Sequence, residues 1–109
     1  MRKVYVSSPL RGNVKSNISK AQWYARFVAE RGHLPIAPHI YFTQFLRDHI
    51  PEERDMAMEM NRELLEWCDE LWVFGDVISE GMQQEIGFAR EAGIEIRYFT
   101  ENLEEVGKA

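Results

Sequence analysis

The feature that most constrains the fold of this chain is a regular alternation of strand and helix patterns. Runs rich in β-branched and aromatic residues, typical of strands, alternate with longer stretches in which apolar residues recur at helical spacing. Strands and helices that alternate in this way form parallel sheets through right-handed crossovers. We therefore expect a small doubly wound α/β fold, Rossmann-like or flavodoxin-like, with about four parallel strands and helices on both faces.

The same patterns place the individual elements. Three strands are predicted at residues 3–8, 69–75 and 94–99, and three helices at 13–32, from 51 to about 68, and 79–93. The stretch 34–42 contains two prolines, so it suits a short or edge strand followed by a loop. We expect residues 43–49 to add one or two turns of helix, and 101–109 to form a short helix or a tail.

Length and composition fit one domain over residues 1–109. The chain is 45% hydrophobic and 28% charged, in the range of a globular domain with one core. A domain of this size buries a modest share of its surface, so we expect a homo-oligomer, a dimer, in which a partner covers Met56, Met58 and Met60. No signal peptide and no run of about 18 apolar residues is apparent. We therefore expect a cytoplasmic protein without membrane contact.

Charge and residue types exclude several functions. The net charge of −5 argues against binding of nucleic acid polymers, although a helix N-terminus with one arginine can still hold a small anion. Cys68 is the only cysteine and is expected in the core. No two histidines have metal-site spacing on one element, so we predict no metal and no organic cofactor.

Ligands of doubly wound folds bind at the carboxyl ends of the strands, which here are followed by SSPLRG, APHIYF and GDVISEG. In the third segment and the helix after it, Ser79 is a suitable N-cap and Gly81 permits close approach of a ligand to the backbone. Glu85 falls within the apolar stripe of that helix, so its carboxylate points toward the core edge. It is either a functional carboxylate or a partly exposed residue at the border of the stripe.

The turn after the first strand offers donors for an anion. Arg11 can bind a phosphate in bidentate fashion, with Ser7, Ser8 and the amide of Gly12 nearby; the alternative is ordinary loop chemistry with a solvated arginine. The turn lacks the spacing of a P-loop or of a dinucleotide fingerprint, which disfavours ATP and NAD chemistry.

Two further groups of residues are candidates for contact with a planar ligand. Asn61 lies among core positions of its helix and must find a partner, either a ligand or a neighbouring backbone group. His39, Tyr41 and Phe42 follow the second strand, where the rings can stack on a base and the imidazole can move a proton; alternatively they only pack the loop.

Together these segments resemble the nucleoside 2-deoxyribosyltransferase superfamily, and in motif most closely its 2'-deoxynucleoside 5'-phosphate N-hydrolases, within a branch of phages and bacteria. The tyrosine and the arginine-glycine pair of that group match Tyr5, Arg11 and Gly12. Its Ser-x-Gly-x-x-x-Glu segment matches the stretch from Ser79 to Glu85. Deoxyribosyltransferases carry an aspartate where this chain has a serine, and a serine suits a 5'-phosphate because it adds no repelling charge.

The resemblance implies a substrate and a mechanism. The partner is a nucleoside 5'-monophosphate or a related small nucleotide, with Glu85 as the nucleophile on the sugar and Tyr5 orienting it. Arg11, Gly12, Ser79 and Gly81 hold the phosphate. Asn61, the third residue of the catalytic group beside Glu85 and Tyr5, contacts the base together with His39, Tyr41 and Phe42.

One departure from the family pattern keeps a second function open. The superfamily usually has an aspartate where this chain has Asn61, and an amide cannot act as an acid toward the base. The alternative is a nucleotide-binding module, a sensor or sequestering protein without turnover. A structural protein without a ligand would leave the inward Glu85 unexplained.

Overall fold

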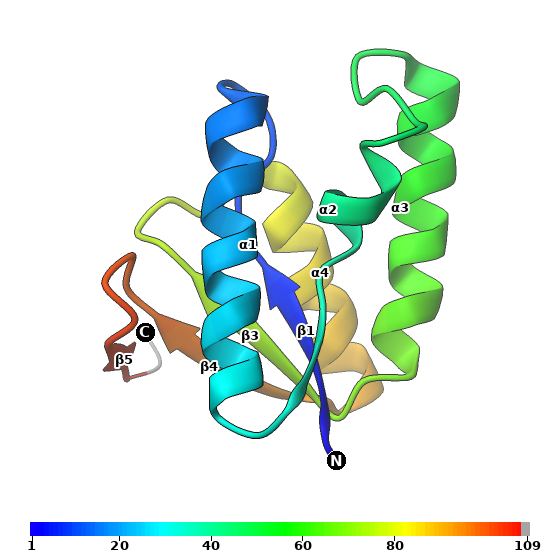
Figure 1. Cartoon of the computed structure of the whole chain (residues 1–109). Helices are drawn as coiled ribbons and strands as arrows, with labels where there is room; N and C mark the ends of the chain where they lie inside the picture. Colours follow the sequence, from blue (N-terminus) through cyan, green and yellow to red (C-terminus); the bar gives the residue numbers. More distant parts are fainter. Residues whose placement is uncertain (108–109) are drawn as a thin grey trace.

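The structure is a computed structural model that describes residues 1–107. Its elements, in chain order, are β1 (Lys3–Ser7), α1 (Val14–Glu30), β2 (Leu34–Ile36), α2 (Pro38–Phe42), α3 (Pro51–Glu66), β3 (Glu70–Phe74), α4 (Glu80–Ala92), β4 (Glu95–Phe99) and β5 (Glu105–Val106). Figure 1 shows a central sheet with α1 against one face, α4 behind the sheet and α3 standing to the side, and buried residues of α3 and α4 share one core cluster. This arrangement confirms the expected α/β class with helices on both faces of the sheet.

The five strands have the spatial order β2-β1-β3-β4-β5. β1 pairs in parallel with β2 and β3, and β3 pairs in parallel with β4. From β1 the chain first builds the sheet toward β2 and then crosses to β3 on the other side of β1. The topological switch point therefore lies between β1 and β3, which is where ligands bind in open α/β sheets.

Three local predictions differ from the structure. Residues 38–42 form a short helix instead of extended chain, because Pro38 occupies the first helical turn, where a missing N–H costs nothing. Residues 43–49 form turns and no further helix. The segment expected to be a terminal helix or tail contains β5, which pairs antiparallel with β4 after a turn at Leu103 (φ 68°); residues 108–109 of that segment lie outside the described part.

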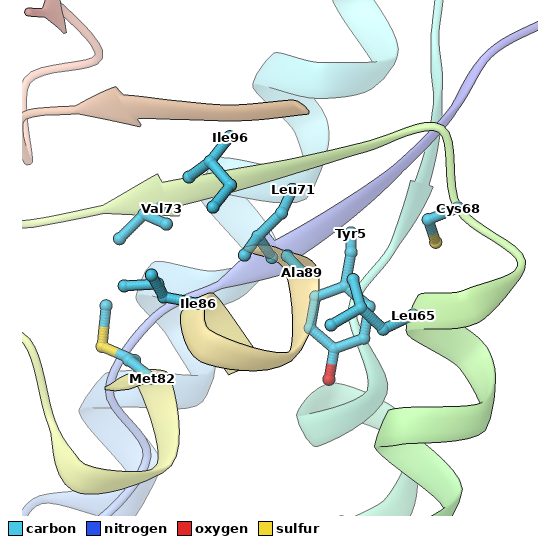
Figure 2. Close-up of a cluster of buried hydrophobic side chains, with 9 residues drawn as sticks. All are labelled: Tyr5, Leu65, Cys68, Leu71, Val73, Met82, Ile86, Ala89 and Ile96. Atoms are coloured by element: carbon cyan, nitrogen blue, oxygen red, sulfur yellow. The ribbon is translucent and has the colours of Figure 1, made fainter. Parts of the chain in front are cut away.

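The core follows from the two-residue period of the strands. Alternate residues of β1 and β3 point to α1, where Val4, Val6, Trp72 and Phe74 pack with the buried side chains of the helix. The intervening residues point to α3 and α4, and the second cluster consists of Tyr5, Leu65, Cys68, Leu71, Val73, Met82, Ile86, Ala89 and Ile96 (Figure 2). The predicted burial of Cys68 and of the Met82, Ile86 and Ala89 stripe is confirmed.

No helix within residues 1–107 is both long enough and apolar enough to cross a membrane.

Candidate active site

A cavity of about 420 Å³ opens at the carboxyl edge of the sheet, beside the switch point. The loop after β1, helix α2 and the facing sides of α3 and α4 form its walls. Its polar lining includes Ser8, Arg11, His39, Arg54, Asn61, Ser79 and Glu85. Segments that are far apart in the sequence therefore meet in one hollow, at the edge where the fold favours a ligand.

Two hydroxyl groups of β1 hold the carboxylate of Glu85. The Tyr5 hydroxyl donates to Oε2 at 2.5 Å, and the Ser7 hydroxyl donates to Oε1 at 2.6 Å. Tyr5 and Ser7 are two residues apart and so point to the same face of the sheet, toward α4. Figure 2 shows Tyr5 beside Leu65, with its hydroxyl oxygen at the far end of the ring. Each carboxylate oxygen thus has one donor, which fixes the orientation of Glu85.

The environment of Glu85 brings its ionisation close to neutral pH. Burial raises the pKa of Glu85 to about 6, and the hydrogen bonds from Ser7 and Tyr5 oppose this rise by stabilising the carboxylate. Burial, followed by the nearby Glu85 charge, raises the pKa of Tyr5 well above its ordinary value. Tyr5 therefore keeps its proton at all ordinary pH values and acts as a donor.

The first turn of α4 lies at the cavity wall. The Ser79 hydroxyl accepts a hydrogen bond from the backbone N–H of Met82 at 3.2 Å, so the serine is the predicted N-cap. Within residues 1–107, the backbone N–H groups of Glu80 and Gly81 donate to no acceptor. Free amides of a first helical turn favour an anion.

Only some of the residues predicted in the loop after β1 line the cavity. Arg11 lines the cavity, and its Nε lies 2.7 Å from Oδ2 of Asp48. The sequence did not indicate this ion pair. Gly12 has φ 95°, a conformation that favours glycine, but it does not line the cavity. The Ser7 hydroxyl donates its hydrogen bond to Glu85, and Oγ of Ser8 lies 3.0 Å from Nε2 of His39.

Asn61 presents a buried acceptor without a donor. Its Oδ1 is shielded from solvent and has no hydrogen-bond partner within residues 1–107. The residue lines the cavity from α3, between Arg54 and Leu65 on the same helical face. Buried acceptors are normally satisfied, so an orphan oxygen at a cavity wall points to a ligand or a water as its partner.

The predicted base-contacting residues separate in space. Burial lowers the pKa of His39 to about 4, so its ring is neutral near pH 7. Phe42 is buried and lines a smaller cavity of about 60 Å³ that shares His39 and Asn61 with the larger one. Tyr41 is 62% exposed, lines neither cavity and packs against Phe45.

Among residues 1–107, the sequence reasoning missed five charged residues of the cavity lining, which are Asp48, Arg54, Glu59, Arg62 and Glu80. Arg54 was detectable, because it lies seven residues before Asn61 and therefore on the same helical face. Asp48 is in a turn, where no periodicity indicates the direction of a side chain. Arg62 lies over the ring of Phe88, 4.3 Å from its centroid. No group of three or more metal-ligating side chains occurs within residues 1–107.

A family model described as a domain of unknown function, DUF7768, matches residues 2–99. The chain belongs to the DUF7768 family. No curated protein matches it in sequence. Among solved structures, this DUF7768 domain is similar to the 2-deoxyribosyltransferase of the psychrotolerant bacterium Bacillus psychrosaccharolyticus, with a TM-score of 0.69 and 21% identity over 96% of this chain and 77% of that one.

At 21% identity the likeness to the deoxyribosyltransferase concerns the fold. It confirms the predicted doubly wound α/β fold. The narrower assignment to the 5'-phosphate N-hydrolases stays a prediction for this DUF7768 domain.

Proposed function

We propose that this DUF7768 domain cleaves or transfers the N-glycosidic bond of a nucleoside 5'-monophosphate, with Glu85 as the nucleophile. The observation that carries the proposal is the Glu85 carboxylate, fixed by Tyr5 and Ser7 at the wall of the cavity. A carboxylate that only stabilised the fold would gain little from a site where burial raises its pKa. The 2-deoxyribosyltransferase fold adds support by analogy.

In the proposed reaction, an oxygen of ionised Glu85 attacks the anomeric carbon of the sugar. The carbon–nitrogen bond breaks, its electron pair leaves with the base, and a glycosyl ester of Glu85 forms. The base takes its proton from solvent, because the Asn61 amide can donate a hydrogen bond but no proton. Water, or a second base, then attacks the anomeric carbon and releases the Glu85 carboxylate.

The cavity lining offers separate groups to the phosphate and to the base of a nucleotide. The free amides at the start of α4, next to Ser79 and Gly81, would receive the phosphate together with Arg11. Gly12 would act only by letting the loop turn, since it does not line the cavity. Asn61 and His39 would contact the base, and Phe42 lines the smaller cavity that shares both residues.

A second candidate function is a nucleotide-binding module without turnover. Asn61 favours it, because the site then has a hydrogen-bonding group but no acid at the base. The retained Glu85 with its two donors disfavours it, since an anionic carboxylate beside the sugar gives no advantage to a phosphate binder.

One experiment separates these functions. The protein is incubated with deoxy- and ribonucleoside 5'-monophosphates, and free base is measured by chromatography for the parent, Glu85→Gln and Glu91→Gln. Glu91 is an exposed glutamate of α4 outside the cavity and serves as a matched control. Base release by the parent and the control but not by Glu85→Gln supports the enzyme. Nucleotide binding without release of base supports the binding module. No binding of any nucleotide would contradict both proposed functions.

The expected homodimer remains a proposal. Met56 is 50% exposed and Trp67 is 64% exposed on α3, and Leu65 is its only buried residue. This is the apolar surface that a second copy would cover, and light scattering measures the mass directly.

A further inference from the structure

The cavity contains a cation that the proposed function does not use. Arg54 lies in the first turns of α3, and it lines both the larger cavity and the smaller one beside it. Its side chain is partly buried and has no ion pair and no hydrogen bond with any residue of 1–107. An arginine in this position has lost part of its hydration without gaining a protein partner.

The other two arginines of the cavity are engaged. Arg11 pairs with Asp48 through Nε at 2.7 Å, so much of its charge is already balanced. The guanidinium of Arg62 stacks on the ring of Phe88. Within residues 1–107, Arg54 is therefore the cavity arginine that has neither an ion pair nor an aromatic ring against its guanidinium. A planar guanidinium with free donors suits the paired oxygens of a phosphate.

The position of Arg54 relative to Asn61 fits the length of a nucleotide. Both residues line the cavity from one face of α3, and they are seven residues apart. At a rise of 1.5 Å per residue, their backbones are separated by about 10 Å along the helix axis. This separation is of the order of that between the phosphate and the base of a nucleotide, so one ligand can reach both side chains.

We propose that Arg54 binds the phosphate of the nucleotide substrate, which enters between Arg54 and the start of α4. This inference rests on the proposed function and names Arg54 as a residue that determines specificity for phosphorylated substrates. Once the phosphate is bound, it competes with Asp48 for Arg11, because an exposed ion pair holds its partners weakly.

The test measures binding, which does not depend on turnover. The affinities of a deoxynucleoside 5'-monophosphate, the matching deoxynucleoside and inorganic phosphate are measured by calorimetry for the parent, Arg54→Gln, Arg54→Lys and Arg90→Gln. Arg90 is exposed on α4 outside the cavity and is the matched control. Arg54→Gln should weaken binding of the monophosphate by about 10- to 100-fold and leave the affinity for the nucleoside unchanged. Arg54→Lys should restore part of the loss, and Arg90→Gln should behave as the parent.

Two results would overturn the inference. One is a parent that binds the monophosphate no more tightly than the nucleoside and binds no inorganic phosphate. The other is an Arg54→Gln variant, with unchanged thermal unfolding, that keeps the full preference for the monophosphate. Failure of the proposed function appears elsewhere, as absence of base release or release that does not require Glu85, so the two failures are distinguishable.

Discussion

The hydroxyl of Tyr5 and the carboxylate of Glu85 form a 2.5 Å hydrogen bond between β1 and α4. The bond joins residues 80 positions apart. It lies at the boundary between the second core cluster, to which Tyr5 belongs, and the cavity, which Glu85 lines. Because the pKa of Tyr5 is well above its ordinary value, this donor cannot lose its proton to the carboxylate. Glu85 is thereby oriented and kept ionisable, which are the two properties that a carboxylate nucleophile needs.

Removing the tyrosine hydroxyl should raise the pKa of Glu85. Tyr5→Phe deletes one of the two hydrogen bonds that stabilise the carboxylate, while burial continues to favour the neutral acid. We expect the titration midpoint to move from about 6 to a higher pH, by about one pH unit. Carbon NMR of the labelled glutamate side chain measures it without any assay of activity. A midpoint that stays in place or falls would contradict the role given to Tyr5.

The same ionisation should appear in the stability of the fold. The pKa of Glu85 is raised to about 6 from 4.5, so its contribution to stability is full below pH 4.5 and is lost as the pH rises through 6. The shift corresponds to about 2 kcal/mol. The free energy of unfolding of the parent, minus that of Glu85→Gln, should therefore fall by about 2 kcal/mol between pH 4 and 8. Urea unfolding at several pH values gives this difference, and a flat difference would show that Glu85 is solvated.

Because Oδ1 of Asn61 has no hydrogen-bond donor, we predict that replacing Asn61 raises the stability of the fold and weakens ligand binding. Asn61→Leu removes a buried acceptor without a donor and should raise the free energy of unfolding by about 1 kcal/mol while weakening nucleotide binding. Asn17→Leu is the control, since its Nδ2 donates to the carbonyl oxygens of Leu10 and Arg11 at 3.0 Å. The free energy of unfolding of this control variant should fall by about 1 kcal/mol. Equal destabilisation in both variants would mean that Asn61 is satisfied.

The buried ring of His39 should make the fold sensitive to acid. Its pKa is lowered by burial from 6.5 to about 4, so the unfolded chain binds a proton that the folded chain rejects between these values. Stability is therefore lost as the pH falls from 6.5 to 4, by up to about 3 kcal/mol from this group. His39→Gln should flatten the loss in acid unfolding curves, with the exposed His49 as a control. Curves that keep the parental slope would contradict the neutral buried ring.

Replacing Asp48 should free Arg11 for a ligand. In Asp48→Asn the guanidinium loses its anionic partner, so nucleoside monophosphate binding should tighten by about 2- to 10-fold. Stability should change by less than about 1 kcal/mol, because the pair is largely exposed. Calorimetric titration of both proteins measures the change. Weaker binding in the variant would place Asp48 in direct contact with the ligand.

Parts of the site followed from spacing alone. The position of Glu85 one turn after Met82 predicted an inward carboxylate, and the structure brings it to the cavity wall. The bond from Ser7 to Glu85 followed from no single motif, although the two-residue period of β1 places Ser7 on the same face as Tyr5. The Arg11 contact to Asp48 was not predictable, because both residues lie in irregular chain whose direction depends on long-range packing.

The sequence alone determined the alternation of strands and helices, the two faces of each strand and the helical face of Glu85, because these depend on local periods of 2 and 3.6 residues. Tertiary structure decided the rest. Pairing with β4 made a strand of residues 105–106, and the packing of α3 against α4 placed Arg54 and Asn61 in the same cavity lining as Glu85. Tyr41, expected after the second strand either to stack on a base or to pack the loop, is 62% exposed. Such placements depend on contacts between distant segments, which the order of residues within any one segment does not encode.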